Sequence, residues 1–389
     1  MYDFDEIVDR RGSYSLKWDV GKQELPMWVA DMDFKTAPEI RAAIEKRAIH
    51  GVFGYTIIPD EWYEAYMYWW KEYHNLELRK DWLVYSNGVI PAISSAIRKL
   101  TTPGENVLIQ TPVYNTFFNS IINNGRNVVQ CPLQYRDYNY KIDFDRLEKN
   151  LSDPQTTMMI LCNPHNPVGK IWDRDTLARI GDLCAKYHVI VLSDEIHCDL
   201  VAPGMEYVPF VSVSENCRRN SISLLAPTKA FNLAGLQTAA AVVLDPVLRH
   251  RLWRGINTDE VGEPNAFAID ATIAAFHEGR SWLEALQVYL QENKLYVSRF
   301  LDSELKQMRV VSTDATYLLW LDCERLAGSV SRFVDYLRES TGLYIMDGKE
   351  YGKAGTGFLR MNIACPRALV QDGMERLKTA VLRYDIISR

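Results

Sequence analysis

The 389-residue sequence lacks any long apolar run, and its longest runs are no longer than a single β-strand. A membrane-spanning helix needs about 18 to 20 consecutive apolar residues, so the sequence predicts no contact with a membrane. The sequence also lacks an excess of basic residues, because 44 Lys and Arg face 50 Asp and Glu for a formal net charge of −6. Nucleic acids attract basic surfaces, so we expect no nucleic-acid partner.

Cysteine motifs are absent as well. The seven cysteines are scattered along the chain, and none of them belongs to a CxxC pair. We therefore expect no metal site and no disulfide framework, but reduced thiols that mostly pack in the core. The first six residues carry acidic side chains, whereas a secretory signal begins with basic residues before an apolar run. The sequence predicts a cytoplasmic protein.

From residue 80 onward, short apolar runs alternate with amphipathic stretches. Strand-like runs occur at residues 82–85, 107–109, 128–131, 158–162, 189–192, 221–225 and 239–244, and helical patterns at 89–100, 114–123 and 174–187. Strands that are separated by helices imply crossover connections and a largely parallel sheet. The runs at 158–162 and 189–192 are apolar throughout, as is typical of strands buried on both faces. The predicted fold class is α/β.

The two ends of the chain have a different pattern. Residues 1–36 show no clear periodicity, and helical patterns follow at 38–51 and 60–74. After residue 245 the pattern is mainly helical, with a long helix near 281–303, and the tail mixes strands with helices. We predict an arm and part of a small domain in 1–48, a large domain in 49–280, and the rest of a small α+β domain in 281–389.

Polar residues follow four of the predicted strands. In open α/β sheets, ligands bind beyond the carboxyl ends of the strands. The residues at these four ends are Asn87-Gly88-Val89, Asn163 to Gly169, Ser193 to His197 and Ala226-Pro227-Thr228-Lys229. They offer a glycine turn into a helix, two amides, an acid and a lysine. Together they indicate a site for a phosphorylated, nitrogen-containing aromatic ring.

Pyridoxal 5'-phosphate (PLP) makes demands that these residues can meet. Its phosphate needs backbone N–H groups at a helix start, which Gly88 and Val89 can supply. Its aldehyde needs a lysine, and Lys229 follows a strand end. Its ring nitrogen needs a carboxylate that keeps it protonated, and its phenolic oxygen needs a donor such as an amide.

The spacing of three motifs resembles that of the fold-type I PLP family of class I/II aminotransferases and their relatives. The motifs are Asn166-Pro167-Val168-Gly169, Asp194-Glu195 and Thr228-Lys229. Segments 25–34 (LPMWVADMDF), 163–169 (NPHNPVG) and 194–200 (DEIHCDL) resemble one branch, the cystathionine β-lyase-like C–S lyases. The likeness extends over essentially the whole chain, and it implies a PLP-dependent transferase fold.

The resemblance implies a role for each matching residue. Lys229 is similar to the lysine that binds the cofactor and later carries a proton, and Asp194 to the partner of the ring nitrogen. The other positions that the resemblance assigns to the cofactor are Tyr114, which stacks on the ring, Asn166, which donates to the phenolic oxygen, and the phosphate contacts Gly88, Val89 and Thr228. We take Lys229, Asp194 and Tyr114 as the candidate catalytic residues.

The substrate contacts rest on the same likeness. Arg360 resembles the residue that binds the substrate α-carboxylate, a task that suits a bidentate guanidinium. Tyr55 resembles a residue that reaches the cofactor and substrate from a second subunit, so the resemblance implies a homodimer with shared active sites. Trp28 is a core residue or a wall of the substrate pocket, and the sequence leaves both interpretations open.

Two positions depart from the pattern of many aminotransferases. Gln237 stands where they have an arginine that faces the phosphate, and Ala226 stands where a serine is common. Both departures therefore concern the set of residues that would contact the phosphate. His197 replaces a tyrosine three residues after the aspartate, and neither it nor His165 is assigned a role.

The branch resemblance implies β-elimination on a sulfur amino acid. Cystathionine would give homocysteine, pyruvate and ammonia, and cysteine would give hydrogen sulfide, pyruvate and ammonia. An aminotransferase uses the same residues up to removal of the Cα proton, so that activity is the alternative hypothesis. A catalytically silent PLP-binding regulatory protein is a third, although such a protein is expected to lose Lys229, Asp194 or Arg360, and all three are present.

Overall fold

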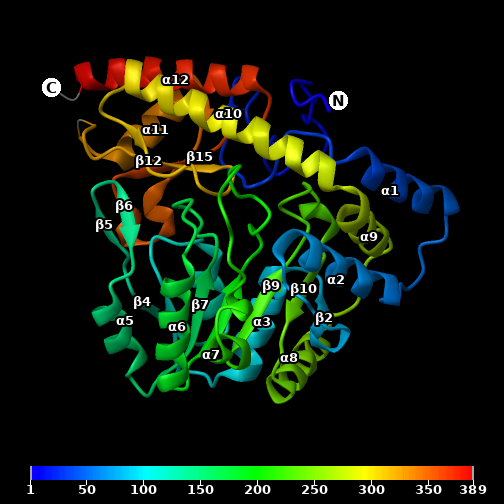
Figure 1. Ribbon diagram of the computed structural model, residues 1–389. Helices are drawn as coiled ribbons and strands as arrows, with labels where there is room; N and C mark the ends of the chain where they lie inside the picture. Colours follow the sequence, from blue (N-terminus) through cyan, green and yellow to red (C-terminus); the bar gives the residue numbers. More distant parts are fainter. Residues whose placement is uncertain (1, 327, 388–389) are drawn as a thin grey trace.

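A computed structural model describes residues 2–326 and 328–387 of the chain (Figure 1). Its centre is a seven-stranded sheet with the order β2-β10-β9-β8-β7-β3-β4. Only β10 runs antiparallel to its neighbours in this sheet, which confirms the predicted, mostly parallel α/β fold. The strands are β2 (Leu83–Ser86), β3 (Asn106–Ile109), β4 (Asn127–Gln130), β7 (Thr156–Cys162), β8 (Ile190–Asp194), β9 (Ser221–Leu225) and β10 (Ala239–Val242).

Helices connect the parallel strands and cover the sheet, because a parallel pair needs a crossover between its strands. The strands β2, β9 and β10 are buried at every position, as two covered faces require. The helix α3 starts at the predicted Val89 and has one strongly apolar face that includes Ile93 and Ile97. The helices of this part are α3 (Val89–Leu100), α4 (Thr116–Ile122), α5 (Phe144–Leu151), α6 (Arg174–Lys186), α7 (Glu215–Arg219) and α8 (Pro246–Thr258).

A second, smaller sheet lies at the other end of the molecule, beneath α10 and α12 (Figure 1). It is antiparallel, with the order β11-β12-β15-β14. The strand β1 (Leu25–Pro26) pairs with β13 (Leu343–Tyr344), so the beginning of the chain lies beside a strand near its end. The other elements here are α10 (Arg280–Glu304), β11 (Arg309–Val310), β12 (Leu318–Asp322), α11 (Val330–Thr341), β14 (Met346–Asp347), β15 (Phe358–Asn362) and α12 (Arg367–Ile387).

Two further helices link the arm to the large sheet. The aromatic helix α2 (Asp60–His74) buries Trp62, Trp69 and Trp70, so its aromatic side chains pack in the core. It lies against α9 (Ala268–Glu278), as does α1 (Pro38–His50). A short hairpin of β5 (Gln134–Arg136) and β6 (Asn139–Lys141) completes the fold.

Two of the compositional expectations can be compared with the structure. All seven cysteines are buried, in agreement with core packing. Among the residues that the structure describes, no helix is both long enough and apolar enough to cross a membrane.

Candidate active site

A cavity of ≈ 240 Å³ opens where the carboxyl ends of β7, β8 and β9 face the start of α3. Parallel strands that end at the same edge of a sheet bring their following loops together. Seven of the predicted residues line this cavity, namely Gly88, Val89, Tyr114, Asn166, Asp194, Thr228 and Lys229. The structure therefore collects residues that are far apart in the sequence at one place.

The amine of Lys229 is held by a backbone carbonyl. The turn after β9 carries this lysine into the cavity, where its Nζ donates a 2.6 Å hydrogen bond to Ala30 O. Ala30 belongs to residues 28–34, a segment without helix or strand that we call the strap. Burial lowers the pKa of Lys229 to about 8, and the negative charge of Asp31 opposes that effect. A larger fraction of this amine is therefore neutral, and nucleophilic, at neutral pH than of an ordinary lysine.

Asp194 is the last residue of β8, and it is 4% exposed. It accepts a 3.1 Å hydrogen bond from the N–H of Ile196. Burial raises its pKa to about 6, because desolvation disfavours the charged form. A cationic group in the cavity would lower this pKa again, so the site suits a protonated ring nitrogen.

The start of α3 provides free backbone donors. The first N–H groups of a helix have no partner within it, and they favour an anion. Gly88 precedes the helix with φ of 154°, a conformation that side chains disfavour. A Cβ at this position would also lie 3.3 Å from Pro91 Cδ, so glycine permits both the turn and the close approach.

Tyr114 and Asn166 are joined through the backbone. The N–H of Tyr114 donates a 3.1 Å hydrogen bond to Asn166 O, which places both residues beside the end of β7. The side-chain oxygen of Asn166 accepts from Arg360 Nη1 at 3.4 Å. The ring of Tyr114 is only partly buried and borders the cavity.

Arg360 enters from the small sheet. It lies in β15, opposite Trp320 of β12 and Met346 of β14. Its Nη2 donates a 2.7 Å bond to Trp28 O, and its guanidinium lies 4.8 Å from the centre of the Tyr351 ring. The Nε atom is buried and has no hydrogen-bond partner. A donor of this kind is available to a carboxylate.

Two predicted residues lie elsewhere in the single chain. Tyr55 is fully exposed in the segment between α1 and α2 and borders a different hollow, together with Trp253. The ring of Trp28 stacks on Tyr344 at 4.9 Å between centroids and does not line the cavity, whereas its carbonyl binds Arg360.

Some residues of the cavity were not predicted from the sequence. Ala30 lines it through the strap, and Thr238 lines it because β10 is antiparallel and presents its amino-terminal end there. Gln237, which the sequence placed near the phosphate, lines the cavity beside Thr238. Tyr317 donates a 2.9 Å hydrogen bond to the same Ala30 carbonyl as Lys229. A coil segment has no periodicity, so only the motif in residues 25–34 could have signalled the strap.

Residues 25–377 match the family described as aminotransferase class I and II. The chain belongs to this family. It is 38% identical to cystathionine beta-lyase PatB of Bacillus subtilis over 97% of this chain and 99% of that protein.

Two solved structures extend the similarity of this class I and II family member to three dimensions. Cystalysin from Treponema denticola, which contains a PLP cofactor, matches with a TM-score of 0.95 and 32% identity over 99% of this chain and 100% of that chain. The PLP-bound C–S lyase from Staphylococcus hominis matches with a TM-score of 0.91 and 31% identity, covering 98% of each chain. These neighbours agree with the predicted fold and with the predicted cofactor.

The cavity of this family member fits PLP on structural grounds. Several polar atoms around it are buried and have no hydrogen-bond partner, including Asn87 Oδ1, His197 Nδ1 and Arg360 Nε. Unpaired buried polar atoms are costly, so they indicate a polar ligand. Burial, together with the positive charges of Lys229 and Arg360, lowers the pKa of His197 to about 3, so its ring is neutral.

Proposed function

We propose that the protein is a PLP-dependent C–S lyase that catalyses β-elimination on sulfur amino acids, with cystathionine and cysteine as the substrates to test first. The observation that carries this proposal is the cavity around Lys229, with Asp194 inside it and Arg360 beside it, in a chain that matches cystathionine beta-lyase PatB over nearly its whole length. The products would be pyruvate and ammonia together with homocysteine or hydrogen sulfide.

The residues that would hold the cofactor have distinct tasks. Lys229 would bind the aldehyde carbon through its amine, and Asp194 would face the ring nitrogen. Asn166 would donate to the phenolic oxygen, and Tyr114 would stack on the flat face of the ring. The N–H groups that follow Gly88 would bind the phosphate. When bound, PLP supplies an electron sink for the negative charge that develops at the substrate Cα.

Lys229 is also the proposed general base. When Lys229 is not attached to the cofactor, its Nζ would be free to accept the Cα proton of the substrate. A base with a pKa near the working pH combines a large neutral fraction with sufficient basicity, and the pKa of Lys229 is lowered to about 8. The Ala30 carbonyl, 2.6 Å away, fixes the position of this amine.

Arg360 would orient the substrate. Its guanidinium is held by Trp28 O and Asn166 Oδ1 and rests beside the Tyr351 ring. A carboxylate bound by this fixed group leaves the Cα–H bond few orientations, and such positioning contributes strongly to rate.

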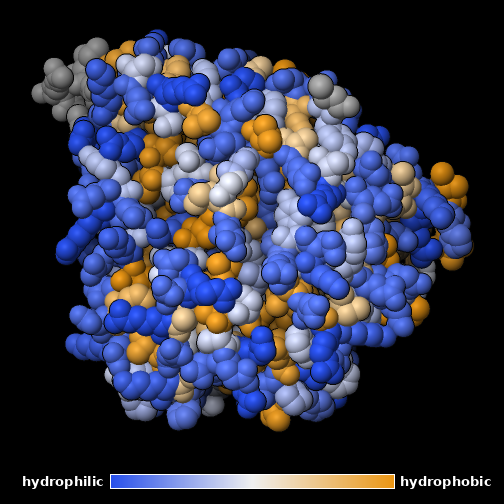
Figure 2. Space-filling view, in the orientation of Figure 1, coloured by the Kyte–Doolittle hydropathy of each residue, from blue (hydrophilic) through white to orange (hydrophobic). Residues whose placement is uncertain are grey.

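We also propose that the protein works as a homodimer. Five exposed side chains lie at the end of α1 and in the segment that follows it, namely Ile49, Val52, Phe53, Tyr55 and Ile57. Figure 2 shows hydrophobic surface at this edge of the molecule. Exposed apolar groups of this kind are typical of protein interfaces. A partner on this surface would cover them and would give Tyr55 an active site to reach.

The deciding experiment is pyruvate release from L-cystathionine by the PLP-loaded protein without any keto acid. We expect pyruvate and free thiol in equal amounts, and the Lys229→Ala protein serves as the control without turnover. If pyruvate is absent and amino transfer starts once a keto acid is added, the protein is an aminotransferase. In that case the lyase proposal is wrong, although the same residues hold the cofactor.

A further inference from the structure

The strap binds both sheets through its backbone carbonyls. On one side its partners are Arg360 and Asn362 of β15, and on the other side Lys229 and Asn232 of the turn after β9. The bonds run from Arg360 to Trp28 O (2.7 Å), from Asn362 to Val29 O (2.5 Å) and Asp31 O (2.6 Å), from Lys229 to Ala30 O (2.6 Å), and from Asn232 to Met32 O (3.1 Å) and Phe34 O (2.9 Å).

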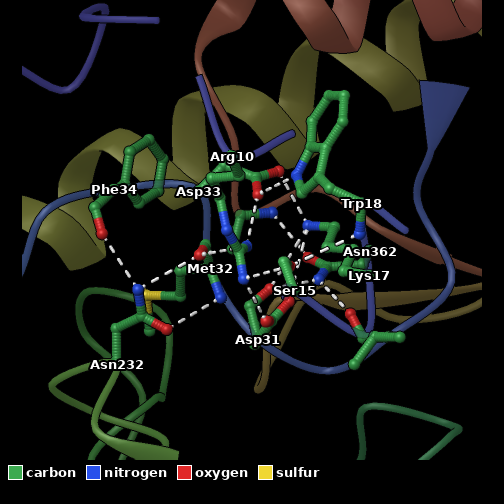
Figure 3. A network of polar contacts seen from close by, with 12 residues as sticks. Arg10, Ser15, Lys17, Trp18, Asp31, Met32, Asp33, Phe34, Asn232 and Asn362 are labelled. Carbon is green, nitrogen blue, oxygen red and sulfur yellow. Dashed lines mark hydrogen bonds and ion pairs between the residues drawn. The ribbon is translucent and has the colours of Figure 1, made fainter. Parts of the chain in front are cut away.

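The carboxylate of Asp31, next to Ala30, has a cation near each oxygen but a hydrogen-bond donor at only one of them (Figure 3). Its Oδ2 forms a 2.7 Å ion pair with Arg10 Nη2. Its Oδ1 is buried and accepts no hydrogen bond, and Lys17 Nζ lies 3.8 Å from it. Lys17 is 1% exposed and pairs instead with Asp33 at 2.7 Å. One oxygen of Asp31 is therefore left without a donor.

This negative charge acts on Lys229. After burial, Asp31 has the largest effect on the pKa of the lysine, and it raises that pKa more than Asp194 does. Asp31 also raises the pKa of Tyr317, whose hydroxyl shares the Ala30 carbonyl with Lys229. The negative charge of Asp31 therefore acts on both groups that donate to this carbonyl, Lys229 and Tyr317.

We propose that Asp31 is a positioning residue whose carboxylate, held by Arg10, stabilises the ammonium form of Lys229 at the Ala30 carbonyl. The inference rests on the proposed role of Lys229 as the base. The Cα–H bond breaks, its electron pair stays on the substrate, and the proton forms a new N–H bond on Lys229 Nζ. The ammonium group then has a carbonyl acceptor and a nearby negative charge, both provided by the strap.

Other charged and titratable groups act near the same lysine, and they come from every element that packs around it. They are Asp194 and His197 at the end of β8, Arg360 in β15 and Tyr317 before β12. Arg360 and the neutral His197 cannot stabilise an ammonium group, and Asp194 would face the cofactor ring. Of the two carboxylates that act on Lys229, Asp31 is therefore the one available to its ammonium form.

The test is the pH dependence of Lys229 labelling in the PLP-free protein, measured with trace acetic anhydride and peptide mass spectrometry. The Asp31→Asn substitution removes one nearby negative charge, so the labelling midpoint should fall by roughly one pH unit. An unchanged or higher midpoint would overturn the proposal. This measurement needs no turnover, so its result is independent of whether the protein is a lyase or an aminotransferase.

The matched control is Asp33→Asn. Asp33 accepts hydrogen bonds from the same Arg10 (2.7 Å) and Lys17 (2.7 Å) and also from Trp18 (2.8 Å). It is not one of the groups that shift the pKa of Lys229. This variant loosens the network without removing the charge at issue, so the midpoint should move by less than about a third of the Asp31→Asn shift. Equal shifts would mean that the network acts only through structure.

A second variant keeps the proposal testable if Asp31→Asn protein does not fold. Arg10→Gln removes the cation that partly neutralises Asp31, so the labelling midpoint of Lys229 should rise. A fall or no change would count against the proposal. Lys294 is the internal reference in every variant, because burial lowers its pKa to about 8 as well and it binds Thr313 O, away from the strap.

Discussion

Arg360 places a rigid planar guanidinium beside the cavity, and the first prediction follows from that shape. Arg360→Lys keeps the charge but loses the bidentate geometry that matches a carboxylate. One charge-assisted hydrogen bond contributes about 1.5–3 kcal/mol, so we expect kcat/KM to fall roughly 10- to 100-fold. Steady-state kinetics would measure this loss. Arg79→Lys, at an exposed position away from the cavity, should leave kcat/KM unchanged.

A second prediction at this scale concerns pH. Only the neutral amine of Lys229 can attack the PLP aldehyde, and its pKa is lowered to about 8. Covalent attachment of PLP to the PLP-free protein should therefore become faster as the pH rises and level off above about 8. Borohydride trapping followed by mass spectrometry would give the rate. A midpoint near the ordinary lysine value of about 10.5 would contradict this expectation.

At the scale of single elements, the start of α3 gives a prediction for Gly88→Ala. The positive φ and the 3.3 Å approach of a Cβ to Pro91 both disfavour a side chain. Strain of this kind costs about 1–3 kcal/mol, and it would displace the N–H groups proposed to bind phosphate. We expect a lower Tm and at least tenfold weaker PLP binding, measured by fluorescence titration.

Gly104→Ala is the control for that variant. Gly104 also has a positive φ (+89°), but a Cβ there would meet nothing within 4 Å, and the residue lies away from the cavity. Its substitution should lower the Tm while PLP binding stays intact. Equal losses of PLP affinity in the two variants would show that strain alone, and not the helix start, explains the Gly88 result.

The elements differ in how well the sequence predicts them. Helices with a clear apolar face, such as α3 and α2, have the predicted bounds, because a 3.6-residue period is set by local sequence. The short helix α5 and the β5–β6 hairpin were not predicted, since three to eight residues hold too little of a period. The direction of β10 depends on its neighbours in space, and a strand pattern does not encode it.

The residues of the site also differ in how well the sequence predicts them. Residues directly after strands were predicted to meet, because the topology of a parallel sheet brings strand ends together. The structure places those residues around one cavity, and their roles remain proposals. In the sequence, only the resemblance of residues 25–34 to the C–S lyase branch pointed to the strap. Its contacts use backbone carbonyls, which every residue has. The division of the chain near residues 48 and 280 also stays a prediction.

At the scale of the whole molecule, the proposed dimer gives a prediction for the exposed segment before α2. Phe53→Glu would place a charge among the apolar side chains of an interface, where an unpaired charge is costly. We expect sedimentation to show a shift from dimer to monomer and a loss of PLP affinity. Val288→Glu, at a half-exposed position on α10, should leave the dimer intact. A wild-type protein that is monomeric with tightly bound PLP would contradict the dimer proposal.

The strap has a further consequence during protein synthesis. Val29 leaves the ribosome early, whereas Asn362, which binds its carbonyl, lies 333 residues later in the chain. At translation rates of about 5–20 residues per second, the strap is synthesised on the order of tens of seconds before its partners in β15. The strap's contacts with β15 therefore form only after nearly the whole chain has been made.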